Sequence, residues 1–203
     1  MDKSTIMKIV VAVAVIAAGW WWFTRRNGEE DFQRAMESMK TVTSFRAQMV
    51  SSDGQTTFIE HECPSSSRTK SPDSEQIQVG AEMYYRYAAG GWTRSGEPVE
   101  HPDLVCKRLA TGQQSDPFPP LVELSRRGLM KQGSVVKVGG VKCREWEIQI
   151  VHPLGTRKET VCLSTDNFLP IQWKVEGATT TYSDYNKPIG IRAPEGAASS
   201  SEN

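Results

Sequence analysis

Residues 141–185 read VKCREWEIQIVHPLGTRKETVCLSTDNFLPIQWKVEGATTTYSDY, and this stretch decides the fold. Apolar and polar side chains alternate along its first part, where Trp146, Ile148 and Ile150 are interleaved with Glu145, Glu147 and Gln149. The same alternation returns at 171–176. Successive side chains of a strand point to opposite faces of a sheet, so a period of two indicates strands with one apolar face. The stretch therefore predicts consecutive antiparallel hairpins.

The turns of these hairpins set the expected pairing of strands. His152-Pro153-Leu154-Gly155 predicts the first turn. A hairpin centred between residues 152 and 153 would set Cys143 directly opposite Cys162, close enough for a disulfide bond. Two-residue loops at 177–178 and 53–54 would set two further pairs opposite each other. These pairs are Trp173 with Tyr182, and Met49 with Phe58.

The cysteines indicate an oxidising compartment. The chain has four, Cys63, Cys106, Cys143 and Cys162. An even number in an exported domain indicates disulfides, and a Cys143–Cys162 bond leaves Cys63–Cys106 as the second. Zinc is the alternative, but the cysteines are separated by 43, 37 and 19 residues and include no C-x-x-C pair, which zinc sites commonly use. No metal site is expected.

Residues 6–23 read IMKIVVAVAVIAAGWWWF and predict a transmembrane helix. Such a helix is about 27 Å long at about 1.5 Å per residue, which just spans a hydrocarbon core about 30 Å thick. Tryptophans at 20–22, followed by Arg25 and Arg26, are typical of a membrane interface. We interpret the segment as an uncleaved anchor. A cleaved signal peptide ending near 17–19 and a buried core helix are the alternatives.

The domain organisation and location follow from these segments. Residues 1–28 form the anchor or signal peptide, 29–194 a single domain, and 195–203 a small, polar tail that is expected to be disordered. The formal net charge is zero, so nothing suggests nucleic acid as a partner. We expect a single-pass protein of the cell membrane whose domain lies on the extracytoplasmic, periplasmic side.

Helices are expected at three places in the domain. The first covers 29–43, where an apolar stripe recurs at helical spacing. The stripe consists of Phe32, Ala35, Met36, Met39 and Val42. It is interpreted as core packing, with a partner-binding face as the alternative. Two further helical candidates, 103–109 and 121–131, lie on either side of Pro119-Pro120.

The middle of the domain predicts further strands. Residues 76–94 contain three alternating or aromatic runs separated by turn residues, which predicts a three-stranded antiparallel meander. Residues 65–74 interrupt the pattern, either as an exposed loop or as an edge strand. The total is about eight antiparallel strands and two or three helices, an α+β domain. A strongly curved sheet, with helices packed on part of its concave face, would leave an apolar cavity.

Several stretches also resemble a known family, over roughly residues 30–194. They are FQRAMESMKTVTSFRAQMV (32–50), EQIQVGAEMYYRYAAGGWTR (75–94), GSVVKVGGVKCREWEIQI (133–150), VCLSTDNFLPIQWKVEG (161–177) and TTTYSDYNKPIGIRAP (179–194). In this order the chain resembles the bacterial lipoprotein-carrier superfamily, the LolA/LolB-like and LppX-like half-barrels. The resemblance implies an open half-barrel plugged by helices, which accepts the acyl chains of lipoproteins or other lipids.

The resemblance implies that the apolar residues at alternate positions of the strands, which share one face of the sheet, are the candidates that line the cavity. They are Met49, Phe58, Ile77, Val79, Tyr85, Trp92, Trp146, Ile148, Trp173 and Val175. The alternative for each is an ordinary core residue. The chain departs from typical carriers in its predicted anchor and in its larger number of cysteines. Both departures favour a tethered receptor, sensor or accessory protein over a mobile shuttle.

Three functions compete. The first is a membrane-tethered module that binds a lipid or an acylated protein. The second is a structural or signalling protein of the envelope with a filled core, whose partners bind the surface, most readily at the proline-rich segment 116–120. The third is an enzyme, suggested only by His61-Glu62-Cys63. No G-x-S-x-G, H-E-x-x-H or Gly-rich phosphate loop is present, so neither catalysis nor a cofactor is expected. Whether Arg86 and Asp184 are surface charges or line a cavity mouth stays open.

Overall fold

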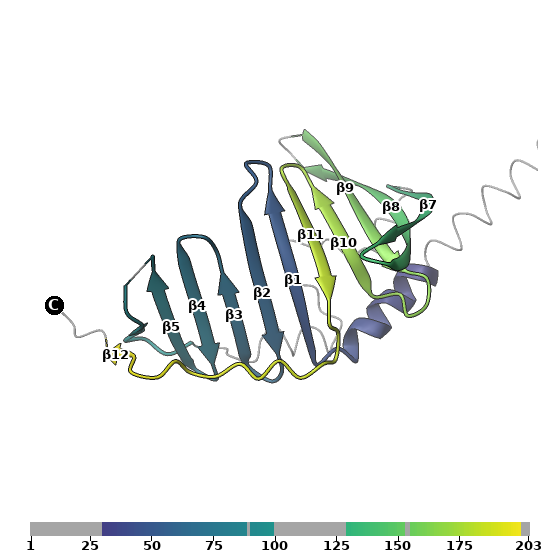
Figure 1. The fold of residues 1–203 in the computed structure, drawn as a ribbon. Coiled ribbons are helices and arrows are strands. Elements are labelled where there is room, and N and C mark those ends of the chain that lie inside the picture. The colour runs from purple at the N-terminus through teal and green to yellow at the C-terminus, as the bar shows by residue number, and fades with distance from the viewer. Residues whose placement is uncertain (1–29, 89, 100–128, 153–154, 200–203) are drawn as a thin grey trace, which may run out of the picture.

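The computed structural model describes residues 30–88, 90–99, 129–152 and 155–199, and within them one sheet of twelve strands. The strands are β1 (Ser44–Ser51), β2 (Thr56–Glu62), β3 (Ser66–Lys70), β4 (Ser74–Val79), β5 (Glu82–Tyr87), β6 (Thr93–Arg94), β7 (Met130–Val138), β8 (Val141–His152), β9 (Gly155–Ser164), β10 (Pro170–Val175), β11 (Ala178–Ser183) and β12 (Ala198–Ser199). Their order is β12-β6-β5-β4-β3-β2-β1-β11-β10-β9-β8-β7, and it can be followed from β5 to β7 across Figure 1. The predicted antiparallel sheet is therefore confirmed, with twelve strands instead of eight.

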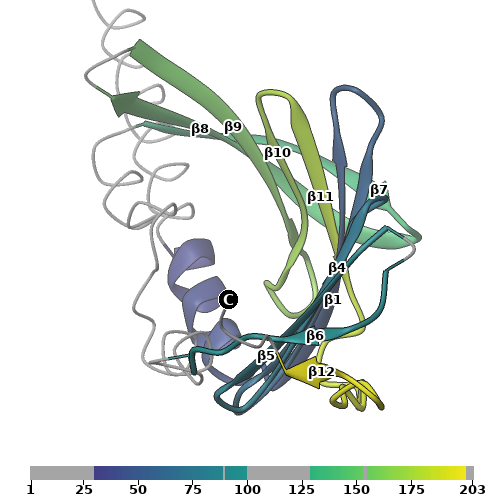
Figure 2. The ribbon, with the colours of Figure 1, turned by 90° about the vertical axis from the view of Figure 1, so that its left-hand side faces the viewer.

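Every pair of neighbouring strands is antiparallel except β12 and β6, which are parallel. The sheet curves, and the helix over residues 30–40 lies on its concave side (Figure 2). Phe32 and Ala35 of this helix are buried against Trp146, Val161 and Trp173. The amphipathic stripe predicted from the sequence thus packs into the core.

The first helix is shorter than predicted. It ends at residue 40, because Thr41 turns the chain by donating from its N–H and its hydroxyl to the carbonyl of Ser38. Thr43 then donates its N–H to Asn186 Oδ1 at 2.7 Å. The chain leaves the helix there and enters β1.

Three predictions about elements need correction. Residues 66–70 form β3, an interior strand between β2 and β4, where the sequence predicted a loop or an edge strand. Residues 130–131, which were predicted to end a helix, belong to β7. Leu129, also predicted to be helical, lies outside any helix just before β7. Residues 121–128 of that predicted helix and the candidate over 103–109 lie outside the described residues.

The disulfide between Cys143 and Cys162 is confirmed, although the predicted register is wrong. The loop of the hairpin is residues 153–154, because His152 pairs with Gly155. Cys143 is therefore opposite Ser164, and Glu145 is opposite Cys162. The two cysteines are diagonal neighbours on one face, with Cα atoms 5.4 Å apart. A shift by two residues keeps both side chains on that face, so the bond still forms.

Two other predicted cross-strand pairs are also displaced. Val175 pairs with Ala178, which moves the turn one residue towards the N-terminus and sets Thr180 opposite Trp173. Phe58 is opposite Gln48, so it does not face Met49. In both hairpins the loop begins or ends at a different residue from the one that the turn sequence suggested.

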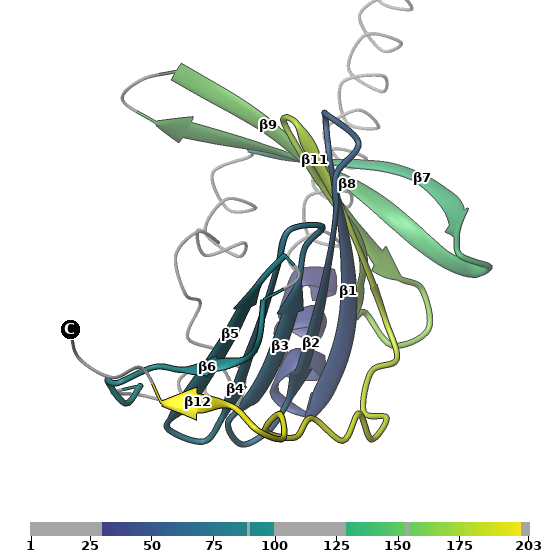
Figure 3. The same cartoon turned by 60° about the vertical axis from the view of Figure 1, so that its left-hand side comes forward.

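Part of the C-terminal tail that was predicted to be disordered is paired with the sheet. Residues 198–199, which fall in the tail expected to be disordered, pair with β6 as β12. Ala198 also donates its N–H to the carbonyl of Trp92 at 3.1 Å. Upstream, Glu62 accepts hydrogen bonds from three consecutive backbone amides of 189–191. These contacts fix the segment that runs from β11 to β12 along the ends of the strands β1 to β5 (Figure 3).

In the described part of the chain no helix is both long and apolar enough to cross a lipid bilayer. The predicted transmembrane segment, residues 6–23, lies outside the described residues, as do Cys106 and the proline-rich segment 116–120. Cys63 is disulfide-bonded, and no described cysteine is free.

Candidate functional site

The concave face of the sheet is identified by the residues that contact the helix. Residues paired across an antiparallel ladder point to the same face. Trp146 is opposite Val161, which is opposite Trp173, and Trp173 is opposite Thr180. Following the same rule through β11 and β1 puts Tyr182 and Ala47 on the concave face, and β2 adds Ile59.

Five predicted lining residues beside or beyond the helix lie on this concave face. Trp146, Ile148 and Trp173 are almost fully buried in the cluster that contains Phe32. Val175 is partly buried against the same cluster, and Met49 is half-buried on β1. The structure therefore brings the candidates from β8 and β10 together under the helix, where they form core.

Tyr85 also lies on the concave face. It is opposite Gln76, which is opposite Thr69, and Thr69 is opposite Ile59 of the concave face. Its ring is 5.9 Å from that of Tyr87. It is distant along the sheet from the helix-covered core, since β5 and β8 are separated by seven other strands.

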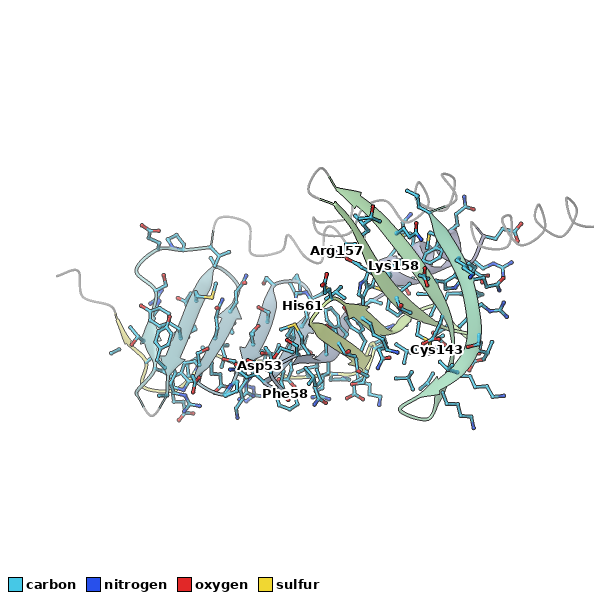
Figure 4. All side chains as sticks on the ribbon, turned by 90° about the horizontal axis from the view of Figure 1, so that it is seen from above. Asp53, Phe58, His61, Cys143, Arg157 and Lys158 are labelled. Atoms are coloured by element: carbon cyan, nitrogen blue, oxygen red, sulfur yellow. A yellow bond between two sulfur atoms is a disulfide. The ribbon has the colours of Figure 1, made fainter. Side chains whose placement is uncertain are left out.

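Four predicted lining residues lie on the convex face instead. Phe58 is 50% exposed there, and Figure 4 shows it on the opposite side of the sheet from His61. Ile77 and Val79 share their face with Phe58, and Ile77 is buried. Trp92 lies under the guanidinium of Arg86, 4.9 Å from the ring centroid. The predicted faces are therefore wrong inside two hairpins, since Phe58 lies opposite to the face of Met49 and Ile77 opposite to the face of Tyr85.

An aromatic cluster centred on Phe45 extends the concave surface beyond the helix-covered core. The ring of Phe45 lies 5.6 Å from His61, 6.2 Å from Tyr182 and 6.3 Å from Tyr185. Burial lowers the pKa of His61, raises the pKa of Tyr182 to about 12 and raises the pKa of Tyr185 well above its usual value. The site is therefore dry enough to favour uncharged side chains.

A buried carboxylate that the sequence pattern did not reveal lies on the same face. Glu159 is 3% exposed and accepts a hydrogen bond of 2.8 Å from Trp173 Nε1. Its other oxygen forms an ion pair with Arg157. The signal in the sequence was a glutamate two and four residues before Val161 and Leu163, at a position where the strand pattern predicts an apolar side chain. The ion pair with Arg157 holds the Glu159 carboxylate in place, and the hydrogen bond to that carboxylate fixes the Trp173 ring at the concave surface.

The convex face carries a chain of alternating charges, which we call the charge ladder. Its members are Lys187, Asp184, Arg46, Glu60, Arg68, Glu75 and Arg86. Arg46 contacts Glu60 at 2.8 Å and Asp184 at 3.1 Å. Glu75, almost fully buried, is held between Arg68 and Arg86. Arg86 and Asp184 are therefore members of this ladder on the outer face.

No described group of three or more histidine, cysteine, aspartate or glutamate side chains converges as a metal site requires. Across residues 30–88, 90–99, 129–152 and 155–199, the concave face offers aromatic and aliphatic surface with single polar groups at its margins. Such a surface can hold an apolar ligand by burial and orient it by a few hydrogen bonds.

A curved antiparallel sheet with a helix in its concavity is the architecture of lipoprotein-carrier-like half-barrels, and the chain has this fold. The lipoprotein LppX of Mycobacterium tuberculosis matches with a TM-score of 0.58 and 11% identity, over 82% of this chain and 99% of that one. LprF from Mycobacterium bovis matches with a TM-score of 0.56 and 12% identity, over 83% and 97%. At these identities the likeness shows the fold alone.

No protein-family model matches the sequence, and no curated protein matches it. The resemblance predicted from the five sequence stretches is nevertheless confirmed at the level of fold.

Proposed function

We propose that the chain binds a lipid, or the acyl chain of a lipoprotein, on the concave face of its sheet while residues 6–23 hold it at the membrane. One observation carries the proposal. Phe32 and Ala35 of the described helix belong to the buried cluster that β8, β9 and β10 form on the concave face, whereas Phe45, Met49 and Ile59 lie half-buried on the same face further along the sheet. An acyl chain is one occupant that suits such a surface.

The energetics favour an apolar ligand. Burial of a methylene group contributes about 0.8 kcal/mol, so a chain of ten or more methylenes gains substantial affinity without specific polar contacts. The aromatic cluster around Phe45 supplies rigid apolar walls, and the high pKa values of its tyrosines reflect exclusion of water. A long saturated chain therefore matches the described surface better than a polar metabolite does.

The compartment proposed is extracytoplasmic. The Cys143–Cys162 disulfide and the disulfide-bonded Cys63 are typical of an oxidising environment. The structural neighbours LppX and LprF share this fold, and LppX is a lipoprotein. Together these observations support a domain that faces the periplasm or its equivalent, next to the membrane that would supply the lipid.

A second candidate function is recognition of an envelope protein by the convex face. Val50 and Phe58 are 38% and 50% exposed there, and they lie on adjacent strands, diagonally across the β1–β2 ladder. Exposed aromatic side chains are common anchors of protein interfaces. This surface is small, so we rank it below lipid binding.

One pair of variants separates the two candidates, because Ile59 and Phe58 are neighbours on β2 that point to opposite faces. The full-length protein in detergent would be delipidated, reloaded from bacterial lipid extract and analysed for bound lipid by mass spectrometry. Ile59→Glu is expected to lose most of the bound lipid, and Phe58→Glu to retain it. Ile59→Trp, which fills the concavity without a charge, controls for unfolding and should also lose lipid.

Equal lipid retention in the three variants and the wild type would contradict the proposal. Loss of a co-purifying membrane protein in Phe58→Glu, with lipid unchanged, would favour the second candidate.

A further inference from the structure

A polar cavity of about 300 Å³ lies where the helix begins, between its first turn, strand β8 and the turn after β9. Its walls include Glu30, Asp31 and Arg34 from the helix, Arg144 and Trp146 from β8, and Phe168. The concave half of the sheet that carries the Phe45 cluster contributes none of these residues. The cavity is therefore a place distinct from the apolar surface described above.

Trp146 lines this cavity and carries an unpaired donor. Its side chain is 2% exposed, and among the described residues its Nε1 has no hydrogen-bond partner. The ring cannot turn to solvent without leaving the core, because Phe32 packs edge-on against it at 5.3 Å. A buried N–H without an acceptor is rare and unfavourable. A ligand oxygen in the cavity would satisfy it.

The charges of the cavity are mixed. Arg144 and Arg34 supply two guanidinium groups, and Asp31 and Glu30 supply two carboxylates. Arg34 is held in place over the Phe168 ring, 5.3 Å from its centroid, as a cation–π pair. Burial raises the pKa of Asp31, and the charges of Arg144 and Arg34 oppose that rise. A simple anion would meet the carboxylates here, and a simple cation would meet the guanidinium groups.

We infer that this cavity binds a zwitterionic phosphoethanolamine group, with phosphate oxygens accepting from Trp146 Nε1 and Arg144 and with the ammonium beside Asp31. A zwitterion satisfies both signs of charge at once. The volume is at the small end for ligand pockets, which fits a headgroup better than an acyl chain. If the bound group is the headgroup of a lipid, the inference rests on the proposed lipid-binding function. The lipid would then be a phosphatidylethanolamine.

The probe is soluble sn-glycero-3-phosphoethanolamine, titrated by calorimetry into the delipidated full-length protein in detergent. Glycerophosphoglycerol, which lacks the ammonium, and inorganic phosphate are titrated in parallel. The ethanolamine compound is expected to bind at least about tenfold more tightly than the other two. Arg144→Gln and Asp31→Asn should each weaken its binding about tenfold or more, since each removes a charge-assisted contact. Arg192→Gln, an exposed charge in the C-terminal segment, is the matched control and should bind as the wild type does.

Trp146→Phe keeps most of the ring and removes the N–H, so it should weaken binding several-fold. Because Trp146 belongs to the core cluster, Trp146→Phe can also weaken binding by destabilising the fold. Its effect is therefore compared with that of Arg144→Gln, since Arg144 lies at the cavity wall outside the core cluster. Equal affinity for all three probes, or no measurable binding of the ethanolamine compound, would overturn the inference.

Lipid recovery from the same preparations separates this inference from the proposed function. Bound lipid that is retained while the ethanolamine compound fails to bind would overturn the headgroup site alone. Binding of the ethanolamine compound without any recovered lipid would support the site and remove the acyl-chain function. Depletion of phosphatidylethanolamine among the lipids bound to Arg144→Gln would identify the lipid as the source of the group.

Discussion

At the scale of single residues, the carboxylate of Glu62 organises the chain that follows β11. It accepts hydrogen bonds from the N–H groups of Ile189, Gly190 and Ile191 at 3.1, 3.0 and 3.2 Å. These bonds, led by that from Ile189, lower the pKa of Glu62. One side chain thereby replaces the strand partner that this extended segment lacks.

Replacing Glu62 should release this segment. In Glu62→Gln the amide oxygen is a weaker acceptor than the carboxylate, so we expect faster hydrogen exchange at 189–191 with little change in β8 and β9. Because the folded pKa is lowered, the stabilisation is present above the unfolded pKa of about 4.3 and is lost as pH falls through the lower folded value. Wild-type exchange corrected for intrinsic rates should accelerate over that acidic range. Glu176→Gln is the control, and identical exchange in all three proteins would refute the role of Glu62.

Tyr182 offers a second test at this scale, because burial raises its pKa to about 12. The folded state favours the neutral phenol, so this contribution to stability is complete below the unfolded pKa of about 10 and is lost as pH rises through about 12. In an ultraviolet titration, Tyr182→Phe should remove absorbance change near pH 12 and leave the change at lower pH as it is in the wild type. Loss of the pH 10 component from Tyr182→Phe would show that its hydroxyl is solvated.

At the scale of elements, the charge ladder joins β1 to β5 on the convex face. Glu75 is its most buried member at 3% exposure. Burial raises the pKa of Glu75, but the hydrogen bonds and charges of Arg68 and Arg86 outweigh that effect and leave the pKa lowered. The interior strand β3 is polar, and these contacts across it explain how it is kept in the sheet.

Glu75→Gln should therefore destabilise the β3–β5 region. Both arginines are partly exposed and can recover water, so we expect a loss of about 1–3 kcal/mol in the free energy of unfolding. The loss should be seen at neutral pH and should disappear on acidification below the lowered pKa, where the wild-type carboxyl is protonated as well. Chemical denaturation at both pH values measures it. Glu97→Gln is the control, and an equal loss in that variant would rule out a specific role for Glu75.

The disulfide acts on the long β8–β9 hairpin. It joins residues 19 apart in the sequence, and closing a loop of this size in the unfolded chain contributes about 3 kcal/mol. The double variant Cys143→Ala/Cys162→Ala should lower the free energy of unfolding by about 2–4 kcal/mol. A reductant should then have less effect on the variant than on the wild type. A variant as stable as the oxidised wild type would contradict this role of the disulfide.

Elements with a clear period were predictable from the sequence, and elements held by polar contacts were not. Trp146, Ile148 and Ile150 mark β8 as a half-apolar strand through their alternation with polar residues. The segment that forms β3, SSRTK, has no apolar period, and its place in the sheet depends on partners from other strands. Residues 198–199 are fixed by pairing with β6, a contact that no local pattern encodes.

At the scale of the whole molecule, the curved sheet was predictable, whereas the assignment of faces was right for β8 and β10 and wrong within the β1–β2 and β4–β5 hairpins. Trp146, Ile148 and Trp173 share the concave face because their strands follow one another through short turns. Phe58 was expected to share a face with Met49, but the true pairing in their hairpin is displaced by one residue, and such a shift moves the side chains of a strand to the other face. The sequence did not reveal that Glu159 is buried, because the contacts that stabilise its carboxylate depend on the fold. Arg157 forms an ion pair with it, and Trp173 of the next strand donates a hydrogen bond to it.

Native mass spectrometry of the full-length protein is the decisive test of whether the concave face holds a lipid. The protein would be extracted gently from membranes, measured, then delipidated and measured again. We expect additional masses of lipid size that disappear on delipidation and that are reduced in Ile59→Glu but not in Phe58→Glu. A bare protein mass in every gently extracted sample would contradict lipid binding and would turn attention to protein partners of the convex face.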